Sequence, residues 1–414
     1  MVAEVFLLLL FVATSVAVTT RPGRIWEGLW PILAGALAVL ARLVPPATAL
    51  TGLQSSLDVL AFFAGLLLLA ACLHREGGMA LGLDLLERRS AGSGRRLLLA
   101  VVLATVAVTV VLSNDAAALL LAPAVLSRLK ARGLPLAPFA VAMALVANAA
   151  SLVLPVSNPV NLLILDRARI PLATYLAELT PAALAGLGLT ALGVMLLSRR
   201  LPDRQLLAPA AGPRARVGGL QQALWVLLLA LALTDAVFVR LQLPIGVPTL
   251  VAGIVAYALV NWRSRAQGML RQLNWGLLAL VLGFSVLASG LAHSTALAAA
   301  ARVTVGGRTG AGAPLLVGVV TAGLSGLVNN LPASLLVTSS LTAAHQLGHL
   351  ALAAIAGADL GPNLAPFGSL STILLLAAVR RAGEAPPWGR LWKMGLLIGP
   401  LALIPSLLIV SALR

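Results

Sequence analysis

Long apolar runs follow one another along the whole chain and are separated by short polar stretches. Most runs are close to the ~20 residues that a helix needs to cross a bilayer, so each is predicted to be helical. Together they predict an all-α polytopic membrane protein. The runs fall at residues 3–19, 26–44, 56–72, 97–127, 137–165, 177–198, 220–238, 245–261, 274–291, 313–344, 350–379 and 391–412.

Two runs, 97–127 and 313–344, are too long for one span and are interrupted by Ser113-Asn114-Asp115 and Val328-Asn329-Asn330. Each arm of about 15 residues measures about 23 Å as a helix. That is less than the ~30 Å of a hydrocarbon core. Basic residues flank both ends of the first run, so its ends are expected on one side of the membrane. Both runs are therefore predicted to be re-entrant hairpins with polar tips.

The runs 137–165 and 350–379 are predicted to be broken spans, because each contains a polar, Pro- or Gly-containing interruption. Three spans, a hairpin, a broken span and a final span then occur twice, starting on opposite sides. The chain is accordingly predicted to form two inverted repeats, residues 1–198 and 220–414, joined by a cytoplasmic linker at 199–219. The expected fold has about ten spans, two re-entrant hairpins and two discontinuous helices, an architecture typical of secondary transporters.

Composition supports membrane embedding and narrows the partners. Of the 414 residues, 60% are hydrophobic and only 10% are charged, although the formal net charge is +16. The basic residues lie in short loops between apolar runs, as expected for cytoplasmic loops, so the lipid bilayer and not nucleic acid is the expected partner. Both termini are predicted to be extracytoplasmic. The single cysteine, Cys72, excludes an intrachain disulfide framework, and neither a metal site nor a cofactor is expected.

The polar breaks are the candidate functional positions. Unsatisfied backbone is costly in hydrocarbon, so a broken helix must be buried in protein or line a cavity. Ser, Asn and Asp favour helix N-caps, and a helix start presents partial positive charge. A cavity between such breaks suits an oxyanion or a hydroxylated solute.

Two acids, Asp115 and Asp359, lie at breaks, where burial disfavours the charged form of a carboxyl group. They are candidate proton carriers, and structural capping is an equally good explanation. Asp235 lies near the end of its run and is expected to face water or the membrane interface.

The breaks also resemble those of a known family. The segment Asn114-Asp115-Ala116-Ala117-Ala118-Leu119-Leu120-Leu121-Ala122-Pro123 is similar to the first hairpin of the arsenical pump membrane protein family, part of the ion transporter superfamily. Further similar segments are Val156-Ser157-Asn158-Pro159-Val160-Asn161, Leu327-Val328-Asn329-Asn330-Leu331-Pro332 and Ala358-Asp359-Leu360-Gly361-Pro362-Asn363, followed by Gly368-Ser369-Leu370. Ala116 stands where the family usually has Gly. The sodium–carboxylate branch carries Ser-Asn-Thr at both tips, which this chain lacks.

The resemblance implies export of arsenite or antimonite by proton antiport with alternating access, with or without a soluble ATPase subunit. It implies that Asp115 and Asp359 are the proton-coupling groups. The implied substrate-binding residues are Ser113, Asn114, Asn158, Asn329, Asn330, Gly368 and Ser369.

Two other functions remain open. One is a sodium/proton antiporter or a sodium-coupled transporter of small oxyanions or carboxylates with the same architecture. The other, more remote, is an integral-membrane enzyme, but Ser113 has no neighbouring His in the sequence that would activate it.

Overall fold

The computed structural model describes residues 2–20, 28–78, 90, 93–198, 218–241, 243–264, 268–273, 275–295, 298–299, 301–302 and 312–413. All regular structure in these ranges is helical, as predicted. Most of the predicted linker, residues 199–217, lies outside the described residues. The described residues therefore do not show how the two predicted repeats are joined.

The predicted runs of the first half correspond closely to helices. Two of them are split at the predicted polar breaks: 97–127 becomes α6 followed by α7, η2 and α8, and 137–165 becomes α9 and α10. The helices are α1 (Val2–Thr20), α2 (Leu29–Leu40), α3 (Pro46–Gln54), α4 (Leu57–Arg75), α6 (Gly94–Val111), α7 (Asn114–Ala116), the π-helix η2 (Ala117–Leu121), α8 (Ala122–Ala131), α9 (Leu136–Ala150), the 3-10 helix η3 (Pro155–Ser157), α10 (Pro159–Ala168) and α11 (Leu172–Leu197).

The second half follows the same order of elements. The run 313–344 is split into α17 and α18, and 350–379 into α19 and α20. The helices are α12 (Gly219–Arg240), α13 (Gly246–Ser264), α14 (Met269–Gln272), α15 (Trp275–Leu291), α17 (Gly312–Val328), α18 (Asn330–Ala343), α19 (Leu347–Leu360), the 3-10 helix η4 (Gly361–Leu364), α20 (Leu370–Arg381) and α21 (Trp388–Ala412).

Several helices are long and apolar enough to cross a bilayer. Within the described residues there are five: α4, α6, α11, α21 and the segment Gly219–Phe238 of α12. Large apolar side chains also cover outward surfaces, as at Leu233 of α12, which is 70% exposed. An apolar exterior suits lipid and not water, so the chain is a multi-pass membrane protein.

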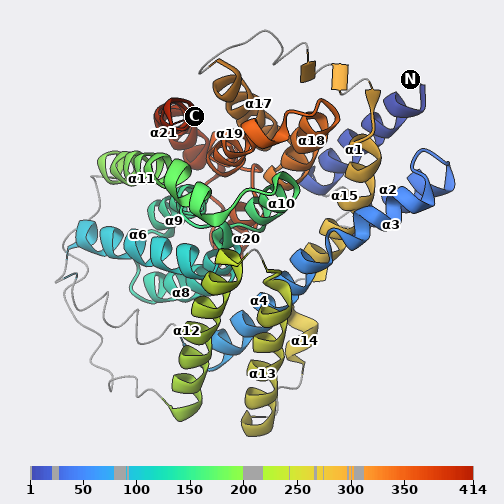
Figure 1. Ribbon diagram of the computed structural model, residues 1–414. Helices are drawn as coiled ribbons and strands as arrows, with labels where there is room; N and C mark the ends of the chain where they lie inside the picture. The colour runs from blue at the N-terminus through green and yellow to red at the C-terminus, as the bar shows by residue number, and fades with distance from the viewer. Residues whose placement is uncertain are drawn as a thin grey trace.

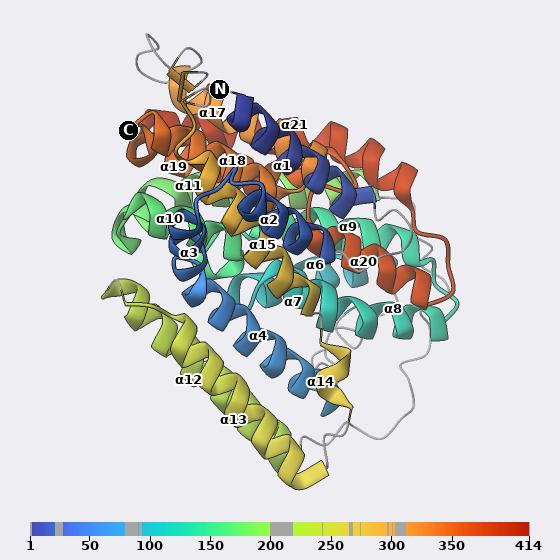
Figure 2. The ribbon, with the colours of Figure 1, turned by 90° about the vertical axis from the view of Figure 1, so that its right-hand side faces the viewer.

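The helices form a bundle from which one pair stands apart (Figure 1). Figure 2 shows α12 and α13 along one side of the molecule beside α4, and both chain termini toward the same end. Glycines allow α4 and α13 to approach closely. A Cβ atom on Gly65 would lie 2.1 Å from the backbone oxygen of Thr249, so a larger residue there would force the helices apart.

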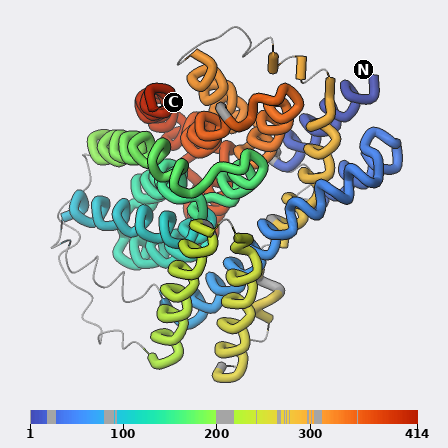
Figure 3. Tube along the Cα trace, viewed as in Figure 1, coloured from blue at the N-terminus to red at the C-terminus, as the bar shows by residue number. Residues whose placement is uncertain are grey.

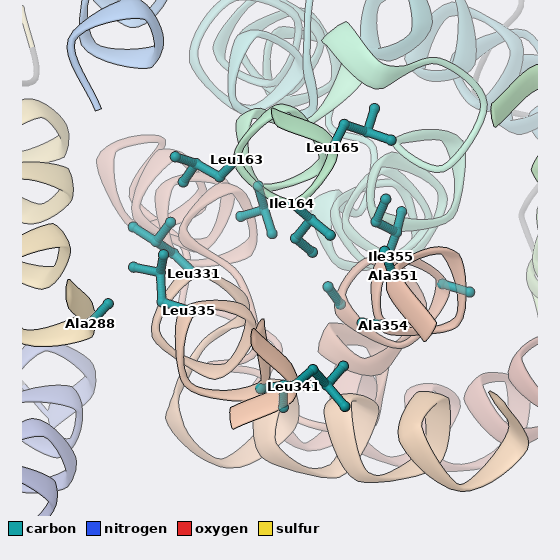
Figure 4. Close-up of a cluster of buried hydrophobic side chains, with 14 of the residues drawn as sticks. Leu163, Ile164, Leu165, Ala288, Leu331, Leu335, Leu341, Ala351, Ala354 and Ile355 are labelled. Atoms are coloured by element: carbon teal, nitrogen blue, oxygen red, sulfur yellow. The ribbon is translucent and has the colours of Figure 1, made fainter. Parts of the chain in front are cut away.

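The second arms of the two broken spans are exchanged between the halves. Helix α10, from the first half, packs against α18 and α19 of the second, and α20 packs against α8 and α9 of the first. The interleaved green and orange segments of Figure 3 follow this exchange. Figure 4 shows Leu163 and Ile164 of α10 in one apolar cluster with Leu335 of α18 and Ile355 of α19. This packing holds the polar breaks at the centre of the molecule.

Candidate functional site

Four helices begin at the polar breaks, and each is capped by a side chain predicted from the sequence. The Ser113 and Ser369 hydroxyls and the Asn158 and Asn329 amide oxygens are the caps. Each accepts a hydrogen bond from a backbone N–H of its own helix, at Ala116 (3.0 Å), Thr372 (3.1 Å), Val160 (3.1 Å) and Leu331 (3.3 Å) respectively. The predicted capping is confirmed at all four, and each cap accepts from one of the backbone N–H groups that a helix start leaves without an intrahelical partner.

A small pocket with a volume of about 30 Å³ lies where these helix starts meet. Val18, Phe63 and Leu280 form its apolar wall on α1, α4 and α15. The polar wall is made of side chains predicted from the sequence, namely Asn114, Asp115, Asn158, Asn329, Asn330 and Ser369. Three other predicted residues, Ser113, Gly368 and Asp359, do not line it.

The tip of the second hairpin is bonded to the break of the second broken span. The Asn330 backbone N–H donates to the Gly368 carbonyl at 2.8 Å, and the Asn329 amide donates to the Phe367 carbonyl at 3.3 Å. A Cβ atom on Gly368 would lie 2.3 Å from the Cα atom of Pro362. Gly368 thus joins the two breaks through its backbone, and only glycine fits there.

Asp359 lies in a polar cluster behind the pocket and is fully buried. Its two carboxylate oxygens accept hydrogen bonds from the side-chain amides of Asn158, at 2.5 Å, and of Asn161, at 2.8 Å. The same Asn161 amide also donates to the Ser151 carbonyl at 3.0 Å. Because Asn158 lines the pocket, Asp359 contacts the site through one intervening side chain.

Asn148 occupies the corresponding place in a second cluster. Its amide nitrogen donates to Asn363 Oδ1 at 3.0 Å and to Thr372 Oγ1 at 3.1 Å. Its amide oxygen accepts from the hydroxyls of Ser369, at 2.9 Å, and Ser371, at 3.3 Å. Thr372 is not among the residues predicted from the sequence, although its position three residues after the Ser369 cap was a signal for it.

Asp115 presents the only ionisable side chain among the residues that line the pocket. Its backbone N–H donates to the Asn114 side-chain oxygen at 2.8 Å, and the residue is 9% exposed. Within the described residues its carboxylate has no hydrogen-bond donor, so it is free to interact with a proton or a solute in the pocket. Nowhere in the described residues do three His, Cys, Asp or Glu side chains lie close enough together to bind a metal ion.

The expectation that Asp235 faces water or the interface is wrong. Asp235 is 7% exposed and points between α12, α13 and α4, near the Thr249 hydroxyl. The helices α4 and α13 cover it, and their closeness follows from the glycine contact described above. Its position in the sequence, five residues before the end of α12, did not reveal this cover.

Comparisons with known proteins agree with the resemblance inferred from the breaks. Residues 16–358 match the family model described as "Citrate transporter". The chain is 27% identical to the arsenical pump membrane protein of Escherichia coli over 405 residues, which cover 94% of each chain. It is 28% identical to a putative arsenical pump membrane protein of Bacillus subtilis (strain 168), with 97% of each chain covered. An uncharacterized transporter of Mycobacterium tuberculosis is 25% identical over 84% of each chain.

Proposed function

Since this chain belongs to the citrate transporter family, we propose that it is a secondary active transporter that exports arsenite or antimonite in exchange for protons. The observation that carries the proposal is the chemistry of the pocket. Its polar wall consists of four amides, one hydroxyl and one carboxyl group, and no Lys, Arg or His lines it in the described part of the chain. The names of the relatives in Escherichia coli and Bacillus subtilis support the same substrate class.

An uncharged trihydroxide suits such a pocket. Arsenite near neutral pH carries three hydroxyl groups, each able to donate and accept a hydrogen bond. Asn114, Asn158, Asn329, Asn330 and Ser369 offer both donors and acceptors. Cys72 is buried in α4 and does not line the pocket. A site without thiolates releases its metalloid readily, as an exporter requires.

A sodium-coupled carboxylate transporter is the second candidate. The description of the family model names citrate, and four helix N-termini surround the pocket, which favours an anion. Against it, the only ionisable group of the described residues that lines the pocket is the acid Asp115. A multivalent carboxylate beside an unpaired carboxyl group is disfavoured unless cations bind with it.

Proton coupling would use Asp115 and Asp359. Asp115 faces the solute directly, so its protonation changes the charge that the solute meets. Asp359 acts through Asn158: a carboxylate accepts two hydrogen bonds, and adding a proton to one oxygen turns it into a donor and displaces one amide. The two acids therefore offer one direct and one indirect link between proton and solute.

The transport cycle we propose is alternating access between two inverted repeats, residues 1–198 and 220–414, with re-entrant hairpins α6–α8 and α17–α18. The common order of elements and the reciprocal polar contacts of the two broken spans support the repeat. The hairpins and broken spans would move together against α1, α4 and α15, which supply the apolar wall of the pocket. Both termini would lie on the extracytoplasmic side.

Everted membrane vesicles test the proposal. With an imposed gradient that is acidic inside, the vesicles should accumulate arsenite without sodium, and dissipating the gradient should release it. The purified protein in liposomes without ATP should behave in the same way, which would make a soluble ATPase unnecessary for coupling. Strict dependence on sodium, or uptake of citrate in place of arsenite, would favour the second candidate.

A further inference from the structure

A third intramembrane acid, Asp235, lies away from the pocket and has no part in the proposed function. It sits in α12, is 7% exposed, and among the described residues is the only ionisable one that lines a small cavity between α4, α12 and α13. An ionisable side chain at such depth is expensive to bury and usually has a functional reason.

The Asp235 carboxyl group has no firm hydrogen-bond donor. The Thr249 hydroxyl lies 3.4 Å from each carboxylate oxygen and 2.8 Å from the Ile245 carbonyl, which is the shortest contact open to its single proton. An unpaired charge in apolar surroundings is costly, so the group is suited to binding and releasing a proton. A side chain that only capped or braced a helix would be held by stronger contacts.

The cavity at Asp235 adjoins the first hairpin tip and the first broken span. Leu112, next to the Ser113 cap, and Val156, two residues before the Asn158 cap, line it together with Phe62 of α4. Asp115, which lines the pocket, lies three residues after Leu112. The cavity thus lies between α12 on one side and the breaks at Ser113 and Asn158 on the other.

A groove with a volume of about 350 Å³ lies next to this cavity. Asp58, Asp166 and Arg169 line it, together with Ile245. Asp58 lies one helical turn before Phe62 on α4, and Ile245 directly precedes α13, four residues before Thr249, so the walls of the groove continue into those of the cavity. Asp58 and Asp235 are close enough to interact electrostatically.

We propose that Asp235 is a second proton-binding site, which passes protons from the groove at Asp58 to the hairpin tip at Asp115. The proposal rests on the proton exchange proposed above. A proton from water in the groove forms the O–H bond of the Asp235 carboxyl group. When that bond breaks, the proton moves through water to the Asp115 carboxylate, and Asp235 regains its charge. Asp58 is the only other charged group that faces Asp235 from the helices packed on it in the described residues, and its Oδ1 is held by the Gly246 backbone N–H at 2.7 Å.

The test separates proton coupling from solute exchange in liposomes that contain the purified protein. Three variants are compared with the wild type: Asp235→Asn, Asp235→Glu, and Glu384→Gln, which removes an exposed acid far from the cavity. Arsenite counterflow without a pH gradient reports exchange, and a trapped pH dye reports protons moved by an arsenite gradient.

We expect Asp235→Asn to keep counterflow within about twofold and to lose proton movement and pH-driven accumulation by tenfold or more. Asp235→Glu should recover at least half of the coupling, and Glu384→Gln should match the wild type. Asp235→Asn with wild-type coupling would overturn the proposal. If the wild type itself shows no pH-driven accumulation, the proposed function is wrong and this inference falls with it.

A measurement on the wild type decides the case in which Asp235→Asn does not fold. Dicyclohexylcarbodiimide reacts with protonated carboxyl groups in apolar surroundings, and mass spectrometry locates the modified residue. The proposal would be supported if Asp235 is modified less as pH rises and if the extent of its modification matches the loss of pH-driven transport. Asp235 left unmodified at every pH, in samples where Asp115 or Asp359 is modified, would contradict it.

Discussion

The clusters around Asp359 and Asn148 are built alike but differ in one functional group. Asn148 lies ten positions before the Asn158 cap, and Asp359 lies ten positions before the Ser369 cap. Each bonds to the cap of the other half, so that Asp359 holds Asn158 and Asn148 holds Ser369. The contacts are reciprocal.

The difference between a carboxyl group and an amide decides which cluster can sense protons. An amide donates and accepts at once, so Asn148 satisfies its neighbours in one fixed state. An ionised carboxyl group only accepts, and a proton changes what it offers to Asn158 and Asn161. Of the two clusters, only the one around Asp359 contains a group whose hydrogen bonding a proton can change.

Replacing Asp359 by Asn should have the largest effect, because it makes the two clusters alike. One of the two amide donors, on Asn158 or Asn161, would face another N–H group, and the proton site would be lost. The loss is on the order of 3 kcal/mol, or roughly 100-fold in pH-driven arsenite accumulation. Vesicle uptake measures it, with size-exclusion chromatography to verify folding. Accumulation at the wild-type level would refute the role of Asp359.

The reverse change, Asn148→Asp, should reduce transport roughly tenfold. A carboxylate oxygen cannot donate to Asn363 Oδ1, so this buried hydrogen bond is lost and two acceptors face each other. The defect should depend on pH. A protonated carboxyl group can donate one hydrogen bond, so activity should partly recover as pH falls and worsen as pH rises. Counterflow measured over a range of pH, with equal pH on both sides, tests this. An equal defect at every pH would argue that shape and not protonation matters here.

Thr372→Val should have a smaller effect, because it removes one hydroxyl and keeps the shape of the side chain. The amide of Asn148 loses one of its two acceptors, at a cost of about 1 kcal/mol and a roughly fivefold loss of transport. Thr372→Ser keeps the hydroxyl and is the matched control. Initial rates of counterflow compare the two, and equal rates would show that this hydrogen bond is dispensable.

Ser371→Ala should have the smallest effect, under about twofold in the same assay, because a long bond contributes little. The Ser371 hydroxyl reaches Asn148 only at 3.3 Å, and Ser369 already supplies that oxygen at 2.9 Å. A loss as large as that of Thr372→Val would show that the cluster depends on all its hydroxyls.

The positions of helices and breaks could be predicted because local signals determine them. The run 350–379 was predicted to be broken, and it is α19 and α20 with Ser369 as the cap. Side chains that cap a helix act on their own backbone, so the sequence alone identifies them. Helix α3 (Pro46–Gln54) was missed, since its nine residues are neither long nor apolar enough to give a span signal.

Contacts between distant segments could not be predicted from the sequence. Asn158 and Asp359 are 201 positions apart, and no local pattern indicates that their side chains meet. The cover over Asp235 likewise depends on how closely α4 and α13 approach. The polar residues that line the pocket were named in advance together with three that do not line it, whereas its apolar wall and the partners of the polar residues were not.

The exchange of α10 and α20 between the halves has a consequence for synthesis. When the ribosome has completed the first half, the Asn158 and Asn161 side chains still lack the carboxylate that they hold in the finished protein. Their partner, Asp359, is made only near the end of the chain, about 200 residues later. The central polar contacts therefore cannot form in order from the N-terminus, and the nascent first half must wait in the membrane, incomplete, for the second.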